Sequence, residues 1–287
     1  MNDQNIKVTL LTSNHSKAPR VVENVEHLLR QKTNFGCKIF VTDVSCREDQ
    51  VKILKDGLEK YPNVELIINS VNLGYAKSHN KIKGKEEGEY IFVINPDVLL
   101  KEEGTLQKAV DFMDANPDVA IMGPQQINDT GEIAMSVRAF PKFYIQVARR
   151  TFLRNLPFLK KKVAYDEMKH LDYSKTQNVD WLQSSCVIIR RDFWEKVGGY
   201  NEYYFLFMAD TEMCLRAWKM GLRVVYYPEI KVYADGKRLS AGGFFKFFQS
   251  WFVRKHVIDA LKYQLKNFGK GNPRKNCCDS RKPKIKS

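Results

Sequence analysis

The sequence lacks the features that mark secreted and membrane-spanning chains. It opens with the polar stretch Met1–Asn5 rather than an apolar leader, and it contains no run of 18 apolar residues. Six cysteines stand at 37, 46, 186, 214, 277 and 278, and the adjacent pair Cys277-Cys278 suits neither an intrachain disulfide nor a CxxC metal site. We therefore expect a reduced, cytoplasmic protein that neither spans a membrane nor is secreted.

Several familiar catalytic and cofactor motifs are also missing. The segment 72–80 contains neither a GxGxxG pattern nor a Walker lysine, so it is no standard nucleotide loop. No serine lies in a nucleophile elbow, and His15, His79 and His256 have no metal-ligand spacing. Whatever chemistry the chain performs must therefore depend on other groups.

Positive charge is abundant, but it is concentrated at one end. The 287 residues carry a formal net charge of +14. Residues 241–287 contain nine Lys and three Arg against two Asp, which gives +10 and leaves +4 for residues 1–240. Because the charge belongs to an appendage and no nucleic-acid-binding motif is present, we do not expect nucleic acid as a partner.

Apolar runs alternate with amphipathic segments through most of the chain, which predicts an α/β fold with a mostly parallel sheet and right-handed crossovers. Strands are expected at 8–12, 38–42, 64–68, 91–94, 119–122, 187–189 and 224–227, and helices at 18–32, 49–60, 77–84, 102–115 and 210–220. Residues 141–178 are basic and weakly periodic, and we interpret them as a long loop with a helix or two. The expected organisation is a domain over 1–240, an amphipathic helical appendage over 241–269 and a disordered tail over 270–287.

Two carboxylates follow predicted strands. The buried strand at 91–94 ends at Asn95-Pro96-Asp97, and the strand at 38–42 ends at Asp43. In open α/β sheets, ligands bind just outside the carboxyl ends of the strands. An acid there can hold a divalent cation and, through it, a pyrophosphate. The alternative for Asp97 is an ordinary turn aspartate after proline.

A further pair of acids stands near a predicted helix start, at Asp210 and Glu212. Either could complement the positive end of the helix dipole, or an acid at the mouth of a cleft could act as a general base. Residues two apart point in different directions on a helix, so only one should face a reaction. Gly74 lies between a strand and a helix, where it can adopt a positive φ or admit a close ligand.

In this order, the motifs resemble those of the inverting family-2 glycosyltransferases with a GT-A fold, most closely the bacterial rhamnosyltransferase branch. The resemblance runs from about Val8 to Ser240. It is carried by six segments: Val41-Thr42-Asp43-Val44-Ser45, Asn72-x-Gly74-Tyr75-Ala76-x-x-x-Asn80, Asn95-Pro96-Asp97, Asp180-Trp181 through Arg190-Arg191 with Gly198-Gly199-Tyr200-Asn201-Glu202, Asp210, and Val232-Tyr233-Ala234-Asp235-Gly236-Lys237-Arg238-Leu239-Ser240. Several long motifs in the right order are far more specific than any one of them.

The resemblance implies a role for each matched residue. Nucleotide-sugar binding would fall to Thr12, Asp43, Asn72, Gly74, Asn95 and Asp97. The acceptor side would use Asp180, Trp181 and Glu202. Asp97 and Asp235 would hold a divalent cation, Mg²⁺ or Mn²⁺, Lys237 and Arg238 would contact the diphosphate, and Asp210 would be the catalytic base.

Three positions depart from the family pattern. Ala209 replaces the glutamate that usually precedes the base, and Asn201 replaces an aspartate. Ala234 stands where the family often has a metal-binding histidine, and a methyl group cannot ligate a cation. Three alternatives follow for the metal: its affinity is weak, Asp235 substitutes for the histidine, or Lys237 and Arg238 neutralise the diphosphate directly.

The appendage contains an apolar stripe at helical spacing, formed by Phe244, Phe248, Trp251, Ile258, Leu261, Leu265 and Phe268. Lys246, Arg254, Lys255, Lys262 and Lys266 supply the polar remainder. A basic amphipathic helix rich in aromatics is typical of a membrane-surface segment, here 244–268, and the alternative is a helix packed on the domain.

The resemblance implies an inverting transferase that moves a sugar, by best match L-rhamnose from dTDP-L-rhamnose, to a saccharide or lipid-linked saccharide. It would work in the cytoplasm, at the inner face of the cell membrane if the appendage binds there. Two alternatives stay open: a degenerate, non-catalytic transferase domain, and a sugar nucleotidyltransferase. The second would normally have a glycine-rich phosphate loop after the first strand, and the segment 12–16 contains no glycine.

Overall fold

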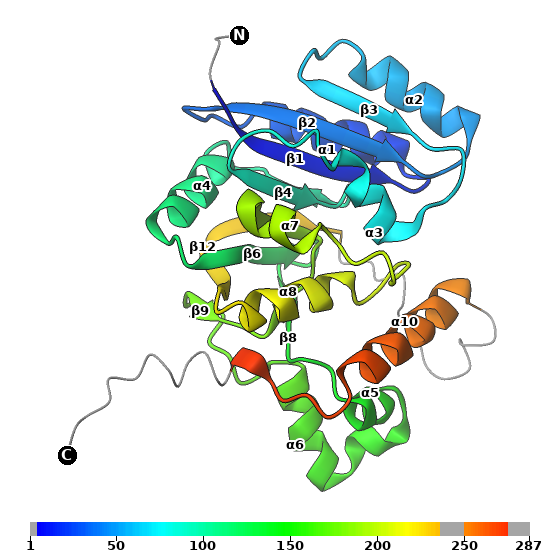
Figure 1. Ribbon diagram of the computed structural model, residues 1–287, viewed down its shortest axis with the longest axis vertical. Helices are drawn as coiled ribbons and strands as arrows, with labels where there is room; N and C mark the ends of the chain where they lie inside the picture. The colour runs from blue at the N-terminus through cyan, green and yellow to red at the C-terminus, as the bar shows by residue number, and fades with distance from the viewer. Residues whose placement is uncertain (1–4, 236–249, 275–287) are drawn as a thin grey trace.

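The computed structural model describes residues 5–235 and 250–274. Within them, ten strands form one sheet in the order β3-β2-β1-β4-β11-β6-β12-β5, with β7 beside β6 and β9 beside β12, and β8 and β10 form a separate pair (Figure 1). The strands are β1 (Ile6–Asn14), β2 (Gly36–Asp43), β3 (Val64–Ile68), β4 (Tyr90–Ile94), β5 (Val98–Leu99), β6 (Val119–Asn128), β7 (Ile133–Ala134), β8 (Val137–Arg138), β9 (Gln177–Asn178), β10 (Trp181–Leu182), β11 (Cys186–Arg190) and β12 (Arg223–Ala234).

The predicted α/β architecture with a mostly parallel central sheet is confirmed. Strands β3, β2, β1 and β4 are mutually parallel, and β6 is parallel to β12. Among the longer strands, β11 lies between β4 and β6 and runs antiparallel to both, and the two-residue strands β5, β7 and β9 are also antiparallel to their neighbours. A short apolar run shows that a strand is buried but carries no information about its direction, so the sequence could not reveal this reversal.

Helices and short 3₁₀ turns connect and cover the strands. They are α1 (Ala18–Leu29), α2 (Glu48–Leu58), α3 (Gly74–His79), η1 (Asn80–Ile82), α4 (Thr105–Ala115), α5 (Phe143–Arg150), η2 (Phe152–Asn155), α6 (Pro157–Asp166), α7 (Arg191–Val197), α8 (Ala209–Lys219) and α10 (Trp251–Asn267). The helix predicted at 77–84 begins earlier in the structure, at Gly74, and ends at His79. The side chain of Asn72 accepts a hydrogen bond from the Gly74 amide at 2.9 Å, and the helix begins there.

Side chains that alternate along the strands form two cores, one on each face of the sheet. Leu10 and Phe92 pack with α1, α2 and α4 on one face, whereas Leu11 and Val93 pack with α3, α7 and α8 on the other. This two-residue period is what a strand buried on both faces requires. Figure 1 shows α7 and α8 on the same side of the sheet.

The weakly periodic stretch after residue 141 folds into a small helical insert formed by α5, η2 and α6. Ile145, Ala148 and Val163 form its core, with Leu153 and Leu159 packed against it. Helix α10 lies beside α5 (Figure 1), and the Gln264 side chain donates to the Pro141 carbonyl at 2.8 Å.

Helix α10 packs on the domain through one face and exposes the other. Val253, Asp259 and Tyr263 are buried, whereas Leu265 is 79% and Phe268 88% exposed. No helix within residues 5–235 and 250–274 is long and apolar enough to cross a membrane. Three members of the appendage pattern, Phe244, Lys246 and Phe248, lie outside the described residues.

Candidate active site

Three parallel strands bring polar side chains to one edge of the sheet. Strand β1 lies between β2 and β4, so the carboxyl ends of all three meet there. Asp43 ends β2, Asn14 ends β1 and Asp97 follows β4. The Asn14 side-chain amide donates to the Asp43 carboxylate at 2.7 Å. Asp43 and Asp97 thus lie at the same sheet edge, as the sequence predicted.

Asp43 is fully buried and held on several sides. Its second carboxylate oxygen accepts from the Ser45 hydroxyl at 3.1 Å, and its backbone carbonyl accepts from the side chain of Asn69 at 2.9 Å. Thr12, two residues before the end of β1, is also fully buried, and its hydroxyl has no hydrogen-bond partner among the described residues. A buried hydroxyl without a partner is uncommon in a folded protein.

Asp97 and Asp235 form an acidic pair at this edge. The Asp235 amide donates to the Asp97 carbonyl at 3.2 Å, and Lys17 Nζ lies 3.8 Å from the Asp97 carboxylate. Burial raises the pKa of Asp97; the nearby Lys17 charge opposes that shift and the Asp235 charge reinforces it. Ala234 pairs with Val98 in the β5–β12 ladder, so the position of the family histidine is occupied by a ladder residue with a methyl side chain.

A pair of carboxylates can contribute part of the ligand set of a hard divalent cation. Mg²⁺ binds through one or two carboxylates, keeps several waters and takes further ligands from substrate phosphates. Among the described residues, no cluster of three or more His, Cys, Asp or Glu side chains is arranged to hold a metal. Any cation here would therefore need oxygens from the substrate or water as well as those of Asp97 and Asp235.

Asn72 and Gly74 shape the turn that leads into α3. The Asn72 amide nitrogen also lies 3.1 Å from His15 Nε2, which ties this turn to the segment after β1. Gly74 has φ +70°, in the region that glycine favours. A Cβ at this position would collide with the Phe205 carbonyl, and the next amide, Tyr75 N, donates to that carbonyl at 2.7 Å. The close approach at Gly74 is therefore made by another segment of the chain.

Asp210 lies in the first turn of α8, after Met208, which has φ +68°. One carboxylate oxygen accepts from the Thr211 amide at 2.8 Å, and the other lies 3.5 Å from the Ser184 amide. Burial raises the pKa of Asp210 from 3.8 to about 6, and these hydrogen bonds only partly oppose the shift. Such a carboxylate is ionised at neutral pH yet basic enough to accept a proton.

Asp210 also lines a small cavity of about 10 Å³, roughly the size of one water molecule. Ser184, Tyr200 and Cys214 share its wall. Glu212 does not line this cavity: it is buried on another side of α8, where its carboxylate lies 2.8 Å from Arg216 and 3.3 Å from Lys266. The two acids do point in different directions, as their spacing predicted.

The residues expected on the acceptor side are each held by neighbours. The Asp180 carboxylate is buried and accepts from Asn272 and Arg274, both at 3.0 Å, as well as from a backbone amide. Trp181 donates its indole N–H to a carbonyl, and Glu202 accepts from Asn80 at 2.8 Å. Residues 272 and 274, which the sequence assigned to a disordered tail, thus contact the domain.

Two other expected contacts, Lys237 and Arg238, lie outside the described residues. Asn95, between β4 and Asp97, is fixed by its backbone, because its amide donates to the Ser185 carbonyl at 2.7 Å. Lys17 and Ser184, which lie beside Asp97 and Asp210, were not among the site residues expected from the sequence. Lys17 immediately precedes α1 and follows a strand that ends at the site, a position that could have signalled an anion contact.

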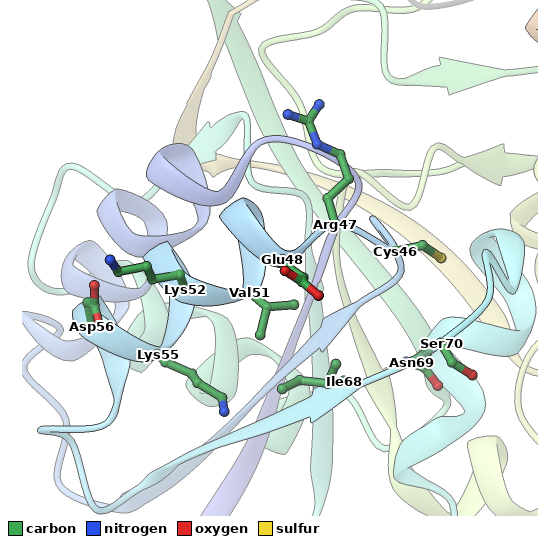
Figure 2. Close-up of a pocket in the computed structure, with 10 residues that line it drawn as sticks. All are labelled: Cys46, Arg47, Glu48, Val51, Lys52, Lys55, Asp56, Ile68, Asn69 and Ser70. Carbon is green, nitrogen blue, oxygen red and sulfur yellow. The ribbon is translucent and has the colours of Figure 1, made fainter.

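A separate open groove of about 460 Å³ runs between α2 and β3 (Figure 2). Val51 of α2 and Ile68 of β3 lie opposite each other in it, and Lys55 extends toward β3. None of the residues that line this groove belongs to the set expected from the sequence. Its lining residue Asn69 bonds to the Asp43 carbonyl, so the groove adjoins the site without containing its acids.

Comparisons with known proteins agree on one class of enzyme. Residues 9–198 match the family described as Glycosyl transferase family 2. N-acetylglucosaminyl-diphospho-decaprenol L-rhamnosyltransferase from Mycobacterium tuberculosis is 30% identical over 190 residues, which are 61% of this chain and 60% of that protein. Rhamnosyltransferase WbbL from Escherichia coli is 25% identical over 232 residues, 77% of this chain and 80% of that one. The chain thus spans about 60% of the length of the mycobacterial relative.

Solved structures give the same picture of the fold. The mannosyltransferase PcManGT from Pyrobaculum calidifontis, in complex with GDP-Man and Mn²⁺, superposes with a TM-score of 0.61 at 16% identity, over 97% of this chain and 69% of that one. Staphylococcus aureus TarS 1-349 in complex with UDP gives a TM-score of 0.54 at 16% identity, over 80% of this chain and 60% of that one.

Proposed function

The chain belongs to glycosyltransferase family 2 and has the GT-A fold, and from this premise we propose that it transfers L-rhamnose from dTDP-L-rhamnose to a hydroxyl of a saccharide or lipid-linked saccharide. The donor is supported by relatives named as rhamnosyltransferases at 25–30% identity. The acceptor class is supported by the name of the mycobacterial relative, which acts on a sugar linked to decaprenyl diphosphate.

The observation that carries the proposal is Asp210, a half-buried carboxylate with a raised pKa that lines a cavity. In the proposed reaction, Asp210 takes the proton of the acceptor hydroxyl as that oxygen bonds to the anomeric carbon. The bond from the anomeric carbon to the phosphate oxygen breaks, and its electron pair leaves with the nucleoside diphosphate. A single displacement of this kind inverts the anomeric configuration.

Negative charge grows on the diphosphate as this bond breaks, so positive charge must lie close to it. Lys17 is placed for this role by its 3.8 Å distance from Asp97, and we assign the same role to Lys237 and Arg238. A divalent cation, when bound by Asp97 and Asp235, would supply further charge as a Lewis acid.

The remaining candidate residues divide between the two substrates. For the nucleotide sugar, we assign Thr12, Asp43, Asn72, Gly74 and Asn95, all close to the carboxyl ends of β1, β2 and β4 or in the turn before α3. For the acceptor, we assign Trp181 and Glu202, with Asp180 acting through Arg274, the cation that its carboxylate holds.

We place the enzyme in the cytoplasm, bound peripherally to the inner face of the cell membrane through 244–268. The exposed side of α10 supports this placement, because it carries an apolar stripe of Ile258, Leu261, Leu265 and Phe268 beside several lysines. Basic amphipathic helices with this pattern bind anionic lipid surfaces.

The test is donor binding and hydrolysis across a panel of dTDP-, UDP- and GDP-sugars, with and without Mn²⁺ or Mg²⁺. We expect dTDP-L-rhamnose to bind most tightly, and more tightly with metal. Equal donor binding without metal would indicate that the basic side chains Lys17, Lys237 and Arg238 neutralise the diphosphate. Failure of every donor to bind would favour the non-catalytic alternative, which the substitutions at Ala209 and Ala234 suggest.

A further inference from the structure

Helix α10 buries a carboxylate where an amphipathic helix normally buries apolar groups. Asp259 is only 1% exposed, although Leu265 on the same helix and Phe268 just after it face solvent. A buried carboxylate is costly unless charge-assisted hydrogen bonds compensate for its lost hydration. The contacts of Asp259 show what compensates it.

Three consecutive backbone amides of the segment before α8 point at this carboxylate. The amides of Phe205, Leu206 and Phe207 donate to Asp259 at 3.3, 2.9 and 3.0 Å. Successive N–H groups that converge in this way form an anion-binding concavity. Here the anion is a side chain of the same protein, contributed from more than fifty residues away.

Side chains of α10 hold the same segment. The Phe205 ring packs edge-on against Trp251 at 5.7 Å between centroids, with Lys255 Nζ 4.9 Å from the ring centre. The Phe207 ring stacks on His256 at 4.3 Å. On the opposite side, the Phe205 carbonyl accepts from the Tyr75 amide of α3. We call residues 205–207, held in this way between α3 and α10, the clasped segment.

The clasped segment leads directly to the proposed catalytic base. Only Met208 and Ala209 separate Phe207 from Asp210, and Met208 has the left-handed backbone conformation that sets the start of α8. A shift of the segment would therefore rotate or translate the first turn of α8. A displacement of about 1 Å at a reacting group can cost 10²-fold in rate.

We propose that Asp259 is a positioning residue for catalysis, which fixes the clasped segment and through it the orientation of Asp210. The inference rests on the proposed function, since it assigns Asp210 as the base. Both carboxylate oxygens accept from amides of the clasped segment, and Lys262 Nζ lies 4.0 Å from one of them, so we assign Asp259 no role as a base or a metal ligand. It acts at a distance, by the geometry it imposes.

The test compares Asp259→Asn with wild type in the full-length protein. An amide of the same shape lacks the charge and presents an N–H where an acceptor is needed. We expect amide hydrogen exchange at 205–207 to accelerate at least tenfold, kcat to fall about 10- to 100-fold, and donor Kd to stay within twofold. The acid limb of the pH–rate profile should move, because the Asp210 carboxylate changes its surroundings.

Two further variants keep the test decisive. Gln264→Ala removes a contact of α10 with the Pro141 carbonyl that does not involve the clasped segment, and it should leave exchange and kcat unchanged. Trp251→Ala removes the ring contact with Phe205, together with contacts to Phe252 and Lys255 within α10, and should lower kcat in the same direction by a smaller factor. If Asp259→Asn does not fold, Trp251→Ala against Gln264→Ala decides the matter alone.

The results separate the two proposals. Accelerated exchange at 205–207 with wild-type kcat and pH profile would overturn the positioning role, as would unchanged exchange in Asp259→Asn. If wild type transfers no sugar from any donor, the proposed function fails. The surroundings of Asp210 are then probed by the change that Asp210→Asn makes in the pH dependence of unfolding. If this change is the same in wild type and in the Asp259→Asn variant, the positioning role is overturned in that case too.

Discussion

Gly74 and Phe205 lie in direct contact across the site, and the Phe205 carbonyl occupies the space that a side chain at residue 74 would need. Gly74→Ala should therefore be destabilising for two reasons, the positive φ and the collision with a backbone atom. We expect a loss of roughly 2–4 kcal/mol in the free energy of unfolding, measured by urea denaturation. Gly84→Ala is the matched control, because Gly84 has φ +79° and open space around it, and it should cost only about 1 kcal/mol. Equal losses in the two variants would contradict the collision.

Asp210→Asn should abolish most of the transfer activity and leave donor binding intact. Removal of a general base typically costs about 10²–10⁴-fold in kcat. Donor Kd, measured by calorimetry, should change less than twofold, because Asp210 acts on the acceptor. In wild type, kcat should rise with pH through an apparent pKa of about 6, the value to which burial raises Asp210. A wild-type rate in the variant would refute the assignment.

The same substitution should stabilise the protein at high pH. The folded pKa of Asp210 lies near 6, above the usual value of 3.8, so ionisation is penalised in the folded state. This cost is absent below pH 4 and complete above pH 6. At pH 8, Asp210→Asn should therefore raise Tm and increase the free energy of unfolding by about 1–3 kcal/mol, whereas at pH 4 it should have little effect. Thermal unfolding at the two pH values measures the difference, and a variant less stable than wild type at pH 8 would contradict the burial argument.

Asp97→Asn should weaken donor binding in the presence of Mn²⁺, because one of the two carboxylates of the acidic pair loses its charge. We expect donor Kd to rise at least tenfold with metal and to change little without it. Lys17→Met is the complementary variant: its partner is the same carboxylate, but it should weaken donor binding in both conditions. Metal dependence that survives Asp97→Asn and Asp235→Asn together would place the cation elsewhere.

The exposed stripe of α10 should bind anionic lipid. We expect the wild-type protein to cosediment with phosphatidylglycerol vesicles and not with phosphatidylcholine vesicles. The double variant Leu265→Glu/Phe268→Glu should lose this binding at least tenfold, because both side chains are largely exposed and their replacement leaves the core intact. Ile53→Glu, at a partly exposed apolar position on α2, is the control and should bind as wild type does.

The sequence was informative where a pattern is local. Buried strands require apolar runs, so the sheet, the acid at the end of β2 and the acid after β4 could be located from the sequence alone. The contacts of Asp180 with Arg274 could not, because a bond between segments 94 residues apart has no local signature. Asp259 was hidden for a related reason: a single acid in a basic helix suggests a surface position, and only the folded chain brings the three amides to it.

The antiparallel strand β11 has a consequence for synthesis on the ribosome. It lies between β4 and β6, so a growing chain that has not yet reached residue 186 presents the edge of β4 without its partner. The unpaired edge of a strand that lies inside the folded sheet is prone to association with other chains. Helix α10 arrives still later, so the segment before α8 gains its last support only when synthesis is nearly finished. Slow translation, or truncation near residue 250, should therefore yield a chain with a complete sheet and an incomplete catalytic centre.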